Sequence, residues 1–580
     1  MYRIWGKRIS FLSFLIIPCI SGQYSMAQEK PDILKRAAVI LEQRGEVVFE
    51  FYPDDNSIVA ELNTFISVDR RTSEGFEAYA NESGFRKFLE YNIPFGLIER
   101  QGRKKSGTGS GEFPGEWDSY PSHEQYFSFM HKMADDYPEI CRLDTIGQSV
   151  DGRNILVMKI TDQPDIREPE PGFVYSSTMH GDETTGFVIL LRLMDYLCSN
   201  YGNDTLVTKL VNNIEIWINP LANPDGAYFK DENGDIVPKR YNSNFADLNR
   251  NFPGIPNLVN PDKMPYQPET MAQMNFLTKI YMVMGANIHD GTEVVNYPFD
   301  TWPDLHADDE WYKRTSREYA EEAQNRSLPL KYMYNALSWP DGITNGWVWY
   351  KVEGGRQDWV NYFVHAREVT LEISLEKNPP GTELPYFWHY NYPSMLRYME
   401  QSLYGIHGII VDDVSGKPLE ASIRVRDHDT LHSDIYSDDI TGYFARLIEP
   451  GIWDLEISAY GYEPVLVDDV QVSPDQATWL DVNLNPFPTK VDVPAGLEVY
   501  PNPFIYRADL SIPVKVPGSY RILLYDIRGT LMLEDLIFYG QQGSYIYSLE
   551  GARLDDGMYL LKLISPDDSR TQKIFKSKRK

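Results

Sequence analysis

Cysteine and basic residues are scarce in this chain of 580 residues. It has 3 cysteines, and 55 lysines and arginines stand against 84 aspartates and glutamates. So few cysteines cannot form the disulfide framework of a small secreted domain. The acidic excess argues against nucleic acid or an anionic membrane as the main partner, and it suits a cationic ligand. Long apolar runs are missing after the N-terminal segment, so we expect no transmembrane segment.

The first residues have the pattern of an export signal. Basic residues precede the apolar run ISFLSFLIIPCIS, and the small residues of SMA follow at the two positions that a signal peptidase inspects. We therefore interpret residues 1–27 as a signal peptide that is cleaved after Ala27. The exported chain retains Cys141 and Cys198, which either pair or lie buried separately as small apolar side chains.

Changes in composition divide the remaining chain into four parts. Residues 29–105 read as a small N-terminal α/β unit and the start of a basic, Gly/Ser-rich linker. Residues 117–404 alternate apolar runs with helical patterns, which predicts an α/β domain with a mixed sheet flanked by helices. Residues 405–485 and 497–580 carry short alternating strands with turn signals, which predict two C-terminal β-sandwich domains.

The role of the N-terminal unit is left open by its sequence. The linker contains Arg103, Lys104 and Lys105, which offer an exposed site for proteolysis. A removable pro-segment, an interaction domain and a folding aid all agree with this pattern.

The largest part contains a metal-ligand pattern at the end of a predicted strand. In MHGDETTG, His180 and Glu183 follow directly after the apolar run FVYSS. Imidazole nitrogen and carboxylate oxygen are ligands of zinc, and His289, at the end of IYMVMGANIH, can supply a third. Each motif is weak alone, because a solvated turn or a core histidine would explain the same residues.

Two more motifs with polar residues strengthen the interpretation as a zinc site. Arg240, Asn249 and Arg250 occur within PKRYNSNFADLNRNFPG, and the guanidinium fork suits recognition of a carboxylate, although surface ion pairs are the alternative. In REVTLEIS, the two-residue period of a strand places Glu368 and Glu372 on one face. A buried carboxylate in a strand needs a partner or a purpose.

This set of motifs resembles the zinc metallocarboxypeptidases, specifically the subfamily of carboxypeptidases E, D and N. The resemblance covers about residues 117–485 and rests on HGDE, NPDG, DLNRNFPG, NIHDGTEVVNYPFD, WYKVEGGRQDW and EVTLEISLEKNPP. Residues 405–485 are similar to the transthyretin-like domain of that subfamily. The motifs VYPNPF, LLYDIRG and GMYLLKL near the C-terminus resemble a type IX secretion sorting domain, which implies secretion machinery as a partner.

The resemblance implies a secreted hydrolase that removes single C-terminal residues from peptides or proteins, with one Zn²⁺ per catalytic domain. Five residues match its metal ligands and catalytic groups: His180, Glu183 and His289 as ligands, Glu372 as general base, and Arg240 as stabiliser of the oxyanion. Five more match its substrate-binding groups: Asn249, Arg250 and Tyr350 at the terminal carboxylate, and Asp300 and Gln357 in the pocket for the last side chain.

In that subfamily an aspartate at the place of Asp300 selects Lys or Arg, so we expect basic C-termini as substrates. The alternative is that Asp300 caps a turn and is neutralised by Arg356. Two other functions stay open: trimming of peptidoglycan stem peptides by an enzyme of the same broad family, and surface binding by a catalytically silent protein. The expected location is the cell surface or the medium, reached through the periplasm.

Overall fold

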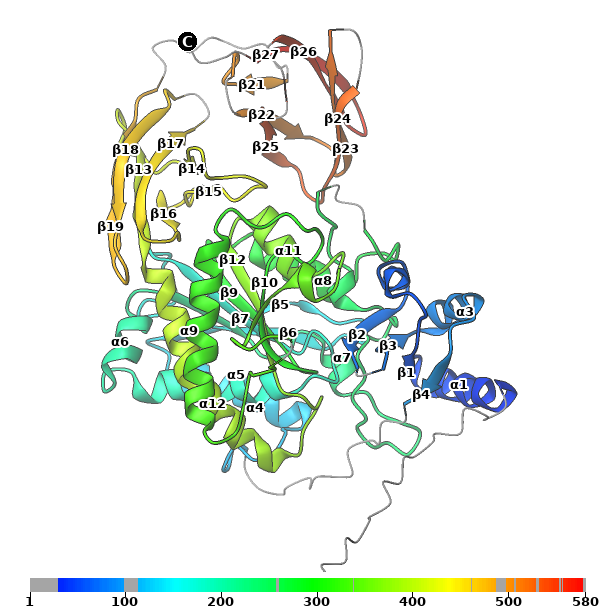
Figure 1. The fold of residues 1–580 in the computed structure, drawn as a ribbon. Coiled ribbons are helices and arrows are strands. Elements are labelled where there is room, and N and C mark those ends of the chain that lie inside the picture. Colours follow the sequence, from blue (N-terminus) through cyan, green and yellow to red (C-terminus); the bar gives the residue numbers. More distant parts are fainter. Residues whose placement is uncertain are drawn as a thin grey trace, which may run out of the picture.

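A computed structural model describes most of the chain outside its N-terminal segment. The described residues are 30–72, 74–98, 113–256, 260–336, 338–459, 462–486, 497–504, 507–527, 531–551, 554 and 557–576. The predicted signal peptide and the basic triplet of the linker lie outside these ranges. The large α/β part is central, the N-terminal unit lies against one side of it, and the strand-rich C-terminal parts lie at one end (Figure 1).

The N-terminal unit is a four-stranded sheet with helices. Its elements are α1 (Lys30–Arg44), β1 (Val47–Phe51), α2 (Val59–Leu62), β2 (Ser67–Arg71), β3 (Phe76–Ala80), α3 (Glu82–Glu90) and β4 (Phe95–Leu97). The strand order is β2-β3-β1-β4, so β2 is an edge strand. Buried aromatic side chains from β1 and α3, including Phe49 and Phe88, form a core separate from that of the large domain.

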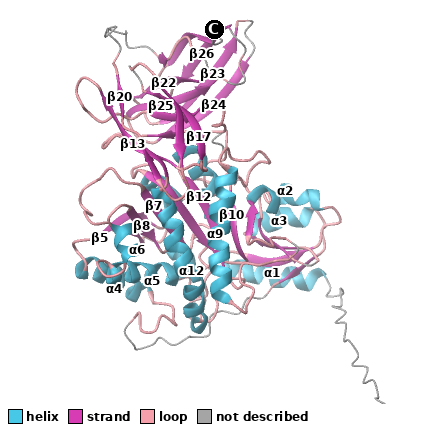
Figure 2. Ribbon diagram, turned by 60° about the vertical axis from the view of Figure 1, so that its left-hand side comes forward, coloured by secondary structure: helices cyan, strands magenta, loops and turns pink. Residues whose placement is uncertain are grey.

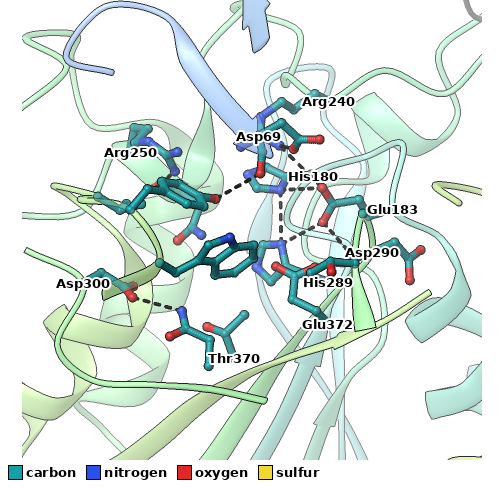
Figure 3. A pocket seen from close by; sticks show the side chains of 17 residues that line it. Asp69, His180, Glu183, Arg240, Arg250, His289, Asp290, Asp300, Thr370 and Glu372 are labelled. Carbon is teal, nitrogen blue, oxygen red and sulfur yellow. Dashed lines mark hydrogen bonds and ion pairs between the residues drawn. The ribbon is translucent and has the colours of Figure 1, made fainter. Parts of the chain in front are cut away.

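A β-bulge interrupts β2 at Asp69. Val68 pairs with Ala78 and Arg70 pairs with Glu77, which leaves Asp69 as an extra residue between two paired ones. A bulge of this kind bends the strand and redirects a side chain. The redirected side chain is the Asp69 carboxylate, which enters the site described below (Figure 3).

The central domain is built on an eight-stranded mixed sheet, as predicted. Its strands are β5 (Cys141–Gln148), β6 (Asn154–Ile160), β7 (Gly172–Ser177), β8 (Glu215–Asn219), β9 (Met282–His289), β10 (Glu293–Tyr297), β11 (Ile343–Asn345) and β12 (Arg367–Ile373). They are ordered β11-β10-β12-β9-β7-β8-β6-β5. Strands β8, β7, β9 and β12 are neighbours and parallel, so their carboxyl ends meet at one edge.

Helices pack on both faces of this sheet. They are α4 (His123–Asp136), α5 (Thr185–Asn200), α6 (Thr205–Val211), α7 (Pro224–Ala227), α8 (Pro268–Leu277), α9 (Asp309–Ser327), α10 (Gly346–Trp349), α11 (Arg356–Trp359) and α12 (Leu384–Glu400). Alternate residues of β7 separate two apolar clusters: Phe173 and Tyr175 join the one that contains α5, α9 and α12, while Val174 joins the one that contains α8. The period of two along the strand produces this division.

The C-terminal parts consist of strands and loops (Figure 2). The first has β13 (Gly405–Asp412), β14 (Ser422–Val425), β15 (Ile435–Tyr436), β16 (Tyr443–Arg446), β17 (Gly451–Ser458), β18 (Val465–Val472), β19 (Ala477–Trp479) and β20 (Val482–Leu484). The second has β21 (Glu498–Tyr500), β22 (Arg507–Val514), β23 (Gly518–Asp526), β24 (Leu531–Tyr539), β25 (Gly543–Glu550), β26 (Gly557–Ile564) and β27 (Ser569–Lys576). Each part has two sheets and its own apolar core.

Two expectations from the sequence concern membrane-spanning helices and the two cysteines of the exported chain. Among the described residues, the structure contains no helix with the length and apolar character needed to cross a bilayer. Cys141 at the start of β5 and Cys198 near the end of α5 are both buried, and their sulfur atoms lie 3.2 Å apart. The two cysteines are therefore free, buried and in contact, without a disulfide bond between them.

Candidate metal centre and active site

Three side chains converge at the carboxyl ends of β7 and β9. Nδ1 of His180 lies 3.0 Å from a carboxylate oxygen of Glu183, and Nδ1 of His289 lies 2.7 Å from the other oxygen. The two Nδ1 atoms are 3.1 Å apart, and all three residues are buried (Figure 3). Two imidazole nitrogens and a carboxylate that face one point form a donor set suited to catalytic zinc.

The loop that carries His180 is held by the NPDG motif. A Cβ atom at Gly181 would lie 2.3 Å from the carbonyl carbon of Gly226, so a side chain at residue 181 would push the loop away. Asn223 donates from Nδ2 to the carbonyl of Met179 at 3.2 Å. These contacts explain why two motifs that are distant in sequence carry glycine and asparagine at these places.

Polar groups behind the histidines orient their rings. Nε2 of His180 lies 3.0 Å from Asp247, and Nε2 of His289 lies 2.6 Å from the amide of Asn287. A metal at Nδ1 requires the proton on Nε2. His180 would donate this proton to Asp247, whereas His289 faces Nδ2 of Asn287, so the amide must be turned for its oxygen to accept. Asp247 also accepts the backbone N–H of Asn249 at 2.9 Å. It therefore links the histidine to the turn that carries Arg250.

Glu372 stands beside the histidine cluster. It lies on β12 in register with His289 on β9, and it lines the same pocket. Burial raises its pKa well above the usual value for a carboxyl group, and the charges of Glu183 and Asp69 act in the same direction. A carboxyl group with a raised pKa can accept and return a proton near neutral pH.

The arginines predicted to contact substrate face the same pocket. Arg240 is nearly fully buried and donates from Nε to Asp247 at 2.9 Å. Arg250 and Tyr350 line the pocket together with Asn249. Nε of Arg250 is buried and has no hydrogen-bond partner among the described residues. The pocket thus contains a cationic group with unused donor capacity at the position predicted to bind a carboxylate.

Asp300, predicted to contact the last side chain of the substrate, lines the same pocket. Its Oδ1 accepts hydrogen bonds from Asn296 at 3.0 Å and from Gln357 at 3.3 Å. Burial raises the pKa of Asp300 to about 8, and the charge of Asp358 adds to the shift. A Cβ atom at Gly346 would lie 1.7 Å from Oδ1 of Asp300, so the carboxylate packs directly on this glycine.

Arg356 pairs with a carboxylate other than Asp300. Its guanidinium forms a buried ion pair with Glu368, with contacts of 2.8 and 3.0 Å. The carboxylate of Glu368 is thereby balanced, and so its place on the same strand face as Glu372 has a structural reason. Asp300 accepts its hydrogen bonds from side-chain amides rather than from Arg356.

Comparison with known proteins relates this site to an enzyme family. Residues 126–394 match the family model for zinc carboxypeptidases. Human carboxypeptidase N catalytic chain is 33% identical over 393 residues, which cover 61% of this chain and 83% of that protein. Mouse carboxypeptidase M is 34% identical over 365 residues, which cover 60% of this chain and 80% of that protein. The chain belongs to the zinc carboxypeptidase family.

Three further comparisons concern the C-terminal region, a longer relative and a solved structure. Residues 498–577 match the model for secretion system C-terminal sorting domains. Human carboxypeptidase D is 39% identical over 376 residues, and this chain spans 26% of its length. Carboxypeptidase A from Helicoverpa armigera, a solved structure, aligns with a TM-score of 0.47 and 16% identity over 61% of this chain and 97% of that one.

Sequence reasoning missed two further charged residues at the site of this zinc carboxypeptidase family member: Asp69, which lines the pocket, and Lys377, which contacts Asp69 and Glu183. Lys377 is buried and lies 2.9 Å from Glu183 and 2.6 Å from Asp69. Asp69 also accepts from Nη1 of Arg240 at 2.9 Å. Lys377 follows a strand in LEKNPP, and Asp69 lies in the separate N-terminal unit, so no local spacing connects them with HGDE.

Two more clusters of possible metal ligands occur among the described residues. Asp308, His428 and Asp429 lie close together, but Asp308 forms ion pairs with Arg367 and Arg446, which join the central domain to the strand-rich part that follows it. The third cluster is a partly buried group of acidic side chains: Asp162, Glu168 and Glu170. The family match and the histidines therefore favour the cluster of His180 as the metal centre.

Proposed function

We propose that the protein is a secreted zinc-dependent carboxypeptidase that removes single C-terminal residues, preferentially Lys or Arg, from peptides or proteins. One observation carries this proposal: the three candidate ligands, Glu372, both arginines and Asp300 line a single pocket. The donor set fits zinc, and the family match supports the same metal. When bound, zinc would supply a Lewis acid to the scissile carbonyl and lower the pKa of water.

Each residue of the pocket has its own role in hydrolysis. Arg250, with Asn249 and Tyr350, binds the terminal carboxylate and so fixes which peptide bond is cut. Glu372 takes a proton from the attacking water and returns it to the leaving amine as the C–N bond breaks. Arg240 faces the negative charge that develops on the carbonyl oxygen. An internal peptide bond offers no carboxylate to Arg250, which makes the enzyme an exopeptidase.

The basic preference rests on unused acceptors around Asp300. Oδ1 of Asn296 and Oε1 of Gln357 are buried and have no hydrogen-bond donor among the described residues. Together with the Asp300 carboxylate they form an acceptor-rich wall, which a guanidinium or ammonium group would satisfy. An apolar side chain would leave these groups unpaired, so we expect discrimination on the order of 10²–10⁴-fold.

The predicted signal peptide and the C-terminal part of the chain, from residue 497 onwards, support export. The match to a sorting domain favours delivery to the cell surface or the medium through the periplasm, and the transthyretin-like character of residues 405–485 remains part of this proposal. Trimming of peptidoglycan stem peptides is less well supported, because Asn249, Arg250 and Tyr350 suit ordinary peptide C-termini. A silent surface-binding role is disfavoured by the complete set of ligands and base.

The test is a screen of peptides that differ only in the last residue, together with the zinc content of the purified protein. We expect about one zinc per chain and release of C-terminal Arg and Lys at least about tenfold faster than Phe. Hydrolysis of none of the peptides by the zinc-loaded protein would reject the enzyme assignment.

A further inference from the structure

Helix α5 follows the metal-ligand loop directly, because it begins at Thr185, two residues after Glu183. The first four backbone N–H groups of a helix have no partner within it, and a side chain at the N-cap position usually accepts one of them. Three other helices of the chain, α3, α4 and α6, follow this rule with the caps Asn81, Ser122 and Asp204. The start of α5 is built differently.

The cap of α5 comes from a distant strand end. Thr184 stands at the N-cap position, but its hydroxyl donates to Oδ1 of Asn378 at 2.9 Å, and within the described structure it accepts no N–H of the helix. The backbone N–H of Thr185 donates instead to a carboxylate oxygen of Asp290 at 3.0 Å. Asp290 directly follows the candidate ligand His289 and is 3% exposed, so this contact is shielded from water. The residue beside one ligand therefore holds the helix that follows another.

A second hydrogen bond connects Asp290 with Glu183 itself. The backbone N–H of Asp290 donates to Oε2 of Glu183 at 3.3 Å, and the same oxygen lies 2.7 Å from Nδ1 of His289. In Figure 3 Asp290 lies next to Glu183 and His289, and its carboxylate points away from the histidine cluster. The backbone of Asp290 thus holds the ligand, and its side chain holds the helix that follows the ligand.

Loss of the Asp290 acceptor would leave a buried N–H group without a partner at the start of α5. Thr185 is fully buried, so water does not reach this group, and the first turn of the helix would have to shift or unwind to satisfy it. Glu183 is joined to that turn through Thr184 alone. Because a metal ligand must stay within about 0.5 Å of its productive position, such a shift would weaken zinc binding.

From these contacts we propose that Asp290 is a positioning residue of the metal centre, which fixes Glu183 by supplying the N-cap of α5 from the end of β9. This inference rests on the zinc-dependent function proposed above. Asp290 acts through Glu183 by accepting a hydrogen bond, so an amide oxygen can replace its carboxylate. A purely electrostatic role, in which a negative charge near the metal raises its affinity, predicts instead that the amide fails.

The experiment measures the zinc affinity of the full-length protein by competition with a chromophoric chelator. Asp290→Ala and Asp290→Leu remove the acceptor, and the leucine keeps a branched side chain. Asp290→Asn keeps an acceptor oxygen and removes the charge. The matched control is Asp204→Ala, because Asp204 caps α6 in the same domain and accepts the N–H of Val207 at 2.9 Å. Melting of the metal-free proteins reports the stability that each cap contributes.

We expect Asp290→Ala and Asp290→Leu to bind zinc about 10- to 100-fold more weakly than the natural protein, and Asp290→Asn to stay within about threefold. Asp204→Ala should melt earlier in the absence of metal, as Asp290→Ala does, and keep the natural zinc affinity. Natural affinity in folded Asp290→Ala or Asp290→Leu would overturn the proposal, and so would a loss of about tenfold in Asp290→Asn. Should circular dichroism show that neither acceptor-free variant folds, Asp290→Asn decides by the same limits.

Hydrolysis of a peptide that ends in arginine separates this inference from the function on which it rests. If the zinc affinities differ as expected and the natural protein cleaves no peptide, the positioning role stands and the carboxypeptidase assignment fails. If the natural protein cleaves the peptide and all variants bind zinc equally, the enzyme assignment stands and the positioning role fails. When both proposals hold, zinc-saturated Asp290→Asn cleaves the peptide faster than zinc-saturated Asp290→Ala.

Discussion

Nδ1 of His180 and Nδ1 of His289 lie 3.1 Å apart, although the two residues are 109 positions apart in the sequence. The parallel pairing of β7 with β9 brings the two strand ends together and places both histidines at one edge of the sheet. When neither Nδ1 atom carries a proton, their lone pairs face each other, and a shared cation would remove the repulsion between them. The site is therefore arranged for a positive ion rather than for packing alone.

Asn287 is expected to control zinc affinity through His289. Its side chain lies 2.6 Å from Nε2 of His289 and offers an acceptor when the amide oxygen faces the ring. Asn287→Leu should weaken zinc binding about 10- to 100-fold, while Asn287→Asp, which keeps an acceptor, should retain most of the affinity. Competition with a chromophoric chelator measures both. Equal zinc affinity in Asn287→Leu and the natural protein would argue against this role.

Glu372 is expected to act in turnover without holding the metal. Glu372→Gln should keep the zinc content of the natural protein and lower kcat by about 10²–10⁴-fold, because the amide cannot accept the proton. Glu376→Gln, at an exposed position just after the same strand, is the control and should leave kcat unchanged. Near-normal turnover in Glu372→Gln would contradict the assignment.

Asp300 is expected to determine the preference for basic residues. The ratio of kcat/KM for peptides that end in Arg and in Phe should be high in the protein and should collapse in Asp300→Ala, because the buried acceptor wall loses its charge. The same ratio is measured for Asp304→Ala, a control a few residues further along at an exposed position. A protein that prefers Phe would show that the pocket has been interpreted wrongly.

The pKa of Asp300 also predicts a pH dependence. Burial first, and then the charge of Asp358, raise this pKa to about 8, so the empty pocket holds a neutral carboxyl group below that pH. A cationic side chain binds the ionised form, so proton release accompanies binding below pH 8. The value of kcat/KM for an Arg peptide should rise with pH up to about 8. The profile for Asp300→Asn should lack this rise, and an unchanged profile would exclude Asp300 as its cause.

Removal of the tail should affect export more than chemistry. Deletion of residues 497–580 removes no residue of the catalytic pocket, so kcat should stay within about twofold. The deletion also removes Arg507, which forms a buried ion pair with Asp434, so some stability should be lost. Fractionation of cells should find the truncated protein retained inside. Normal delivery to the surface or medium would contradict the sorting role of the tail.

The sequence predicted the central sheet, and it named residues that the fold brings together at one edge of that sheet, because the relevant signals are local. His180 and Glu183 lie in one loop, and His289 and Glu372 end or nearly end apolar strand patterns, so parallel pairing was enough to bring them together. The pairing of Arg356 with Glu368, in place of the neutralisation of Asp300 that the sequence allowed, was not predictable, because no local spacing points to it.

Asp69 and Lys377 could not be connected with the site from the sequence. Their contacts join segments 308 residues apart, and each depends on how a whole unit docks on the central domain. The bulge in β2 that turns Asp69 towards Arg240 has no signature in SVDRR, since alternation would predict a regular strand. Docking between units is decided by surface complementarity over many residues, which local periodicity does not report.

The central claim is that this pocket removes one C-terminal residue at a time by zinc-dependent hydrolysis. The direct measurement is mass spectrometry of an Arg-terminated peptide after incubation with the zinc-loaded protein, in parallel with the same protein carrying Glu372→Gln. The account predicts a product lighter by one arginine residue, formed only by the first protein and abolished by a zinc chelator. Cleavage at an internal bond, or equal product from the Glu372→Gln protein, would contradict it.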